Sequence, residues 1–110
     1  FAHAIESVQS FKGLNHGEAV GVGMVCAAKL SLLLGKINSQ EFDKIKSLIE
    51  KFNLPIKLPA NCEPAKILKA MQSDKKSKDK TLRFIILDGI GKVKIVENVD
   101  KEKILNSLII

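Results

Sequence analysis

Residues Leu14–Ala28, with the sequence LNHGEAVGVGMVCAA, decide the fold of this chain. The stretch begins with a histidine and a carboxylate, His16 and Glu18, and then carries no charge from Ala19 to Ala28. A helix that is apolar on every side has to be buried on every side, so we predict that residues 19–34 form the central helix of the core. Small residues along this helix let neighbouring backbones approach closely.

The polar start of this stretch needs a chemical explanation, because burying an imidazole or a carboxylate costs free energy unless it is paired or binds a ligand. His16 precedes Gly17, which lets the backbone bend tightly and hold the imidazole within reach of another element. Imidazole is a good zinc ligand, but a zinc site needs about three protein ligands. Taken alone, His16 is more simply a histidine at a helix start. Glu18 does not share a helical face with it, and we expect Glu18 to cap the helix or support a ligand.

The composition indicates one domain over residues 1–110 and argues against several functions. The chain is 45% hydrophobic and 27% charged, as in ordinary soluble domains. Its net charge of +6 comes without Trp or Tyr, so few rings can stack on bases and we expect no nucleic-acid partner. The uncharged run ends at Lys29, short of the ~20 residues that span a bilayer, so we expect no membrane association. Cys26 and Cys62 lack the spacing of a metal pair, and we expect free thiols in a cytoplasmic protein.

Periodicity elsewhere predicts a mainly α fold, a helical bundle with one small β-hairpin near the C-terminus. Apolar residues recur at helical spacing between Phe42 and Phe52, and Ser39 is the predicted N-cap of that helix. The β-formers from Leu82 to Leu87 are followed by turn residues at Asp88–Gly91, which predicts the hairpin. We also predict helices over residues 2–10 and 64–73, a last helix capped by Asp100, and Gly35 as the stop of the central helix.

Two further groups of residues are chemically suggestive. His3 and Glu6 lie three residues apart and therefore share a helical face, either as an oriented acid–base histidine or as an ordinary surface pair. The segment 74–80 is rich in lysine, and such runs are usually solvated surface. Lys75 and Lys76, closest to the preceding helix, are the best placed to reach an anionic substrate, and their spacing does not choose between them.

Taken in order, these motifs resemble the C-terminal half of the 3-dehydroquinate synthase family over essentially the whole chain. Two departures from the family pattern are Ala2, where glycine is common, and Asp79-Lys80, near where a glycine commonly follows the DKK motif. The motifs that carry the resemblance are Phe1-Ala2-His3-Ala4-Ile5-Glu6, His16-Gly17-Glu18-Ala19-Val20 with Gly23-Met24, Met71-x-x-Asp74-Lys75-Lys76, Leu82-Arg83-Phe84 and Ile90-Gly91.

The resemblance implies a lyase of the shikimate pathway, which makes aromatic amino acids. The family converts 3-deoxy-D-arabino-heptulosonate 7-phosphate to 3-dehydroquinate and phosphate, using bound NAD and a divalent metal, zinc or cobalt. By resemblance, His16 would be a metal ligand and His3 a substrate-contacting acid–base residue. Lys75 or Lys76 would bind the sugar phosphate substrate.

The resemblance also implies that this single domain is the metal- and substrate-side part of a longer enzyme. The nucleotide-binding domain and the other metal ligands would precede Phe1, so we expect the isolated chain to be inactive and the full-length parent to be a homodimer. Two alternatives stay open. One is a related sugar-phosphate cyclase, such as a 2-deoxy-scyllo-inosose synthase. The other is a non-catalytic helical module that binds an acidic partner through its lysine-rich segment.

Overall fold

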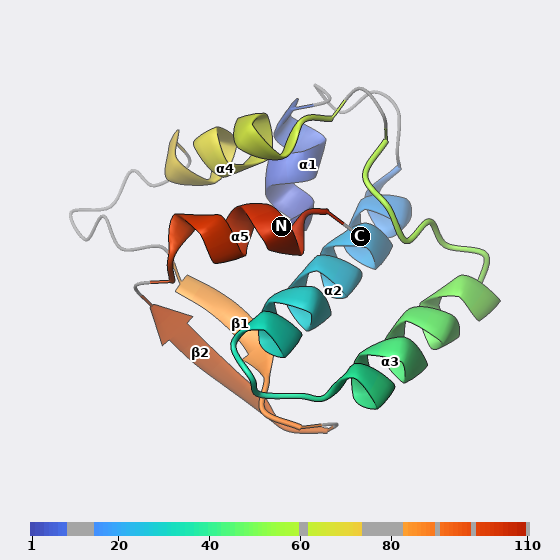
Figure 1. Ribbon diagram of the computed structural model, residues 1–110. Coiled ribbons are helices and arrows are strands. Elements are labelled where there is room, and N and C mark those ends of the chain that lie inside the picture. Colours follow the sequence, from blue (N-terminus) through green and yellow to red (C-terminus); the bar gives the residue numbers. More distant parts are fainter. Residues whose placement is uncertain (9–14, 60–61, 74–82, 90, 98, 110) are drawn as a thin grey trace.

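Helix α2 (His16–Leu33) runs through the centre of the molecule, and every other described element packs on it directly or through a neighbour. The computed structural model describes residues 1–8, 15–59, 62–73, 83–89, 91–97 and 99–109. Figure 1 shows α3 (Ser39–Lys51) along one side of α2, and α1 (Ala2–Val8), α4 (Pro64–Ser73) and α5 (Lys101–Ser107) on the opposite side, with the hairpin near the C-terminal end of α2. The expected mainly α fold with one late hairpin is therefore confirmed. The hairpin consists of β1 (Arg83–Leu87) and β2 (Val93–Glu97).

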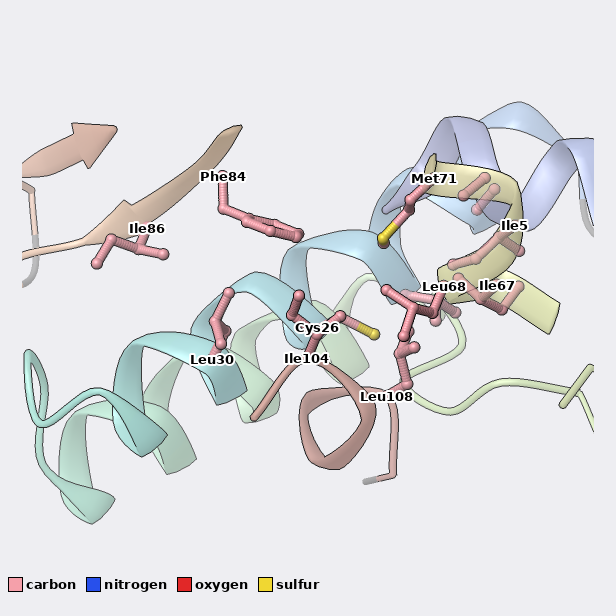
Figure 2. Close-up of a cluster of buried hydrophobic side chains, with 13 residues drawn as sticks. Ile5, Cys26, Leu30, Ile67, Leu68, Met71, Phe84, Ile86, Ile104 and Leu108 are labelled. Atoms are coloured by element: carbon pink, nitrogen blue, oxygen red, sulfur yellow. The ribbon is translucent and has the colours of Figure 1, made fainter. Parts of the chain in front are cut away.

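The apolar character of α2 is explained by burial on two faces. One face enters the main core, where Cys26 and Leu30 meet side chains from α1, α4, β1 and α5 (Figure 2). The other face, with Val25 and Ala28, packs against Phe42 and other apolar residues on and around α3. Because both faces are covered, a continuous uncharged sequence suits this helix better than an amphipathic one.

Local capping explains where the helices begin, and it corrects two predicted boundaries. Helix α2 begins at residue 16, three residues before the predicted start, because Asn15 caps it. Helix α3 is capped by Asn38, so the prediction of Ser39 as N-cap was wrong. A capping box needs a carboxylate three residues after the cap, and Glu41 stands at that distance from Asn38, where it accepts from the Asn38 backbone N–H at 3.0 Å.

Several other predicted boundaries are confirmed. Helix α4 covers residues 64–73, and Asp100 caps α5. Gly35 follows the end of α2 with φ +74°, the left-handed conformation that commonly ends a helix. In the hairpin, β1 and β2 pair antiparallel, with Ile85 opposite Ile95. The buried Ser31 hydroxyl ties the hairpin to α2, because it donates to the Ala27 carbonyl at 2.7 Å and accepts from the Leu87 N–H at 2.9 Å.

An apolar groove lies between α2, α3 and the hairpin, with a volume of about 370 Å³. Strand β1 turns Phe84 and Ile86 into the core, whereas Ile85 on its other face is 67% exposed. The hairpin is therefore apolar on both faces, although only one of them is packed against the core. We call the hollow between α2, α3 and the hairpin the apolar groove. It is lined by Met24, Ala27, Ala28, Ile45, Leu48, Ile49, Phe52, Leu54, Ile85, Ile86, Leu87 and Val93.

Within the described residues, no helix has both the length and the apolar character needed to cross a lipid bilayer.

Candidate metal-ligand site

His16 is the first residue of α2, and its side chain is 77% exposed. The turn that presents it is held by the capping box on either side. The Asn15 side chain accepts from the Glu18 backbone N–H at 2.8 Å, and the Glu18 carboxylate accepts from the Asn15 backbone N–H at 2.9 Å. Glu18 therefore caps the helix, which was one of its two expected roles. The result is an ordered helix start that carries an accessible imidazole.

The partner of His16 is Glu6, which comes from a different helix. The Nδ1 atom of His16 lies 3.1 Å from Oε1 of Glu6, and the Glu6 side chain is only 13% exposed. Two neighbours of Glu6, Ala4 and Ile5, are buried in the main core together with Ala19 of α2. The apolar packing of α1 on α2 therefore places the Glu6 carboxylate beside the His16 imidazole.

This pair was missed by sequence reasoning, which associated Glu6 with His3 because they lie on the same helix. His3 belongs to α1, and its side chain lies outside the described part of the structure. Lys75 and Lys76 follow α4 and also lie outside the described residues, as does the rest of the lysine-rich segment. The only sequence signal for the His16–Glu6 pair was a carboxylate and an imidazole in two neighbouring helices, and contacts between helices do not follow from spacing.

The chemistry of His16 fits one ligand position of a metal site. A metal-binding histidine commonly donates its other ring N–H to a carboxylate, and Glu6 is placed to accept at Nδ1. Among the described residues, no three side chains of the His, Cys, Asp and Glu types gather closely enough to hold a metal ion. A metal on His16 would therefore need ligands from outside this described set.

The two cysteines do not contribute to this site. Both Cys26 and Cys62 are buried and neither is in a disulfide, as the sequence led us to expect. Burial raises the pKa of the Cys26 thiol to about 12. Because the thiolate is the form that attacks electrophiles and binds metals, Cys26 serves as an apolar core residue.

Comparisons of sequence agree with the motifs. The family described as 3-dehydroquinate synthase C-terminal matches residues 1–77. The chain is 40% identical over 107 residues to a 3-dehydroquinate synthase from Thermodesulfovibrio yellowstonii, which covers 94% of this chain and 30% of that protein. It is 44% identical over 108 residues to the enzyme of that name from Nitrosomonas europaea, which covers 98% of this chain and 29% of the relative. The chain thus spans about a third of the length of these relatives.

Comparisons of structure find the same fold in two other synthases. A 2-epi-5-epi-valiolone synthase from Streptomyces hygroscopicus, solved with NAD⁺ and Zn²⁺, matches with a TM-score of 0.83 and 26% identity, over 98% of this chain and 31% of the other. A 2-deoxy-scyllo-inosose synthase, solved with carbaglucose-6-phosphate, NAD⁺ and Co²⁺, matches with a TM-score of 0.77 at the same 26% identity, over 97% of this chain and 32% of the other. The family match covers well over half of the sequence, and the chain therefore belongs to the 3-dehydroquinate synthase C-terminal family.

Proposed function

We propose that this chain is the C-terminal, metal- and substrate-side part of a 3-dehydroquinate synthase. The parent would be a lyase that converts 3-deoxy-D-arabino-heptulosonate 7-phosphate to 3-dehydroquinate and phosphate. The observation that carries this proposal is the difference in identity between two groups of relatives. Those named 3-dehydroquinate synthase reach 40–44%, whereas the valiolone and inosose synthases stand at 26%.

The residue roles in this proposal follow from the site. His16 would hold a divalent metal, Zn²⁺ or Co²⁺, through the ring nitrogen that does not face Glu6. When bound, the metal would polarise substrate oxygens and NAD would accept and return a hydride; both groups are present in solved structures similar to this chain. His3 would exchange protons with the substrate, and Lys75 or Lys76 would bind its anionic groups.

The nucleotide-binding portion would precede Phe1 in the same polypeptide, and the apolar groove supports this arrangement. Relatives are about three times as long as the chain, and exposed apolar surface of this extent typically marks an interface. The ring centroids of Phe1 and Phe84 are 5.5 Å apart. Phe1 lines a second hollow that shares Met24, Ala27 and Ile85 with the apolar groove. A polypeptide leading to Phe1 would therefore arrive at the edge of the groove and cover it.

This arrangement has consequences for the isolated chain and for the parent. The 110 residues alone would lack the NAD site and most metal ligands, so we expect no turnover from them. The full-length parent would be a cytoplasmic homodimer.

The experiment that tests the proposal is turnover by the full-length protein and its His16→Ala variant. We expect the wild type to release phosphate from 3-deoxy-D-arabino-heptulosonate 7-phosphate only with a divalent metal. His16→Ala should lose this activity by about 100-fold or more, because it removes one metal ligand outright, while its circular dichroism spectrum is unchanged.

A matched control is Ser39→Ala, because Ser39 is likewise the exposed first residue of a helix that starts with an Asn–Glu capping box. It should keep full activity. Release of phosphate from glucose 6-phosphate, and not from the heptulosonate, would refute the proposal in favour of an inosose synthase. Full metal-dependent activity in His16→Ala would remove His16 from the metal site.

A further inference from the structure

We propose that Glu6 is the positioning residue for His16, selecting the ring nitrogen with which His16 binds the metal. This inference rests on the proposed function, since it concerns how the proposed metal ligand is oriented. The family motifs pair Glu6 in sequence with His3, and the contact with His16 is visible only in the fold.

The protonation pattern of the pair follows from its atoms. An ionised carboxylate has no hydrogen to donate and can only accept. The short contact between Glu6 Oε1 and His16 Nδ1, 3.1 Å, therefore requires the proton on Nδ1. In a neutral imidazole with its proton on Nδ1, the lone pair is on Nε2, and a metal binds a neutral imidazole through that lone pair. Glu6 thereby assigns Nε2 of His16 to the metal.

Burial makes Glu6 the fixed member of the pair. Its side chain is 13% exposed, whereas that of His16 is 77% exposed. Helix α1 is anchored in the core by Ala4 and Ile5 on the chain just before Glu6, so the carboxylate is held by packing that does not involve the histidine. An exposed imidazole at a helix start otherwise samples several rotamers, and the bond to Glu6 reduces this freedom before any metal arrives.

Glu18, the other carboxylate close to His16 in sequence, has a different task. Its Oε1 accepts from the backbone N–H of Asn15, which stabilises the helix start and leaves the ring of His16 untouched. Glutamine serves equally well at this position of a capping box. Glu18→Gln therefore removes one negative charge near His16 without removing the cap, and it is the matched control for changes at Glu6.

The test uses the full-length protein with ¹⁵N-labelled histidine, in wild-type, Glu6→Ala, Glu6→Gln and Glu18→Gln forms. In the metal-free wild type at a pH where His16 is neutral, ¹⁵N NMR should show the proton on Nδ1. In Glu6→Ala it should show a mixture with a large share of the other tautomer. The dissociation constant for Zn²⁺ should rise about 10- to 100-fold in Glu6→Ala, as for other partners of metal-binding histidines. Glu6→Gln keeps an oxygen that can accept from Nδ1 and should recover part of the loss, and Glu18→Gln should match the wild type.

The outcomes separate this inference from the proposed function. If His16→Ala loses Zn²⁺ and Glu6→Ala binds it within twofold of wild type, the role of Glu6 is refuted and that of His16 stands. The same holds if the proton of His16 stays on Nδ1 in Glu6→Ala. If His16→Ala itself keeps the affinity for Zn²⁺, the proposed metal site is wrong, and the positioning role of Glu6 is overturned with it. Should Glu6→Ala fail to fold, Glu6→Gln with wild-type affinity and a redistributed tautomer would refute the proposal in its place.

Discussion

Truncation of Leu30 should be among the most destabilising single changes in the chain. Leu30 is fully buried in α2 and packs in the main core with Phe84 and Ile86 of β1 (Figure 2). Alanine and leucine have similar helix propensities, so Leu30→Ala changes packing and leaves the helix itself intact. Leu48→Ala on α3 is the matched control, because the same atoms are removed from a side chain that is 56% exposed.

The magnitude follows from burial. Leucine to alanine removes three carbon atoms, and at about 0.8 kcal/mol for each buried methylene the transfer loss is roughly 2.4 kcal/mol. The cavity left behind adds to this loss, and measured Leu→Ala changes in protein cores cost about 2.7–5.0 kcal/mol. We therefore expect Leu30→Ala to cost about 3–5 kcal/mol. The control should cost about 1 kcal/mol, since less than half of its side chain is buried and no closed cavity forms.

The assay is urea unfolding of the 110-residue chain followed by circular dichroism at equilibrium. Stability of a domain is typically 5–15 kcal/mol, so Leu30→Ala should shift the midpoint strongly at an unchanged slope. Equal costs for the two variants, or a cost below about 1 kcal/mol for Leu30→Ala, would contradict the assignment of α2 as the buried centre of the fold.

Two further predictions concern the thiols and the apolar groove. Because the pKa of Cys26 is raised to about 12 from an ordinary value of 9.0, the unfolded thiol ionises first as the pH rises. The free energy of unfolding should therefore not depend on Cys26 below pH 9, and between pH 9 and pH 12 it should fall by up to about 1.4 kcal/mol per pH unit. Unfolding of Cys26→Ala, measured against pH, should lack this slope; the same slope in both proteins would contradict the burial. Phe52→Ser removes an exposed ring from the groove and should change the stability of the 110-residue chain by less than about 0.5 kcal/mol. It should lower the melting temperature of the full-length protein by several degrees. If Phe52→Ser leaves the melting temperature of the full-length protein unchanged but abolishes a concentration-dependent dimer, the groove would instead bind a second molecule of the same protein.

The candidate site shows where sequence reasoning stops. His16 stood out at the start of an uncharged helix, but its role as a metal ligand came from the family resemblance, and Glu18 lay within the reach of a local capping pattern. Glu6 was paired with His3 because they lie one helical turn apart, and the structure instead joins it to His16, ten residues away. Spacing describes neighbours on one helix, whereas the meeting of two helices depends on how their apolar faces pack.

By itself, the sequence determined the elements of this protein: an uncharged central helix, the limits of α4, the glycine that ends α2 and the hairpin after residue 82. These signals act within a few residues, because caps, turns and periodicity are properties of a short length of backbone. Only the tertiary structure decided which carboxylate meets His16 and which face of the hairpin is left uncovered. Both depend on where separate elements come to rest against α2, and a hairpin that is apolar on both faces carries no local signal for which of them turns inward.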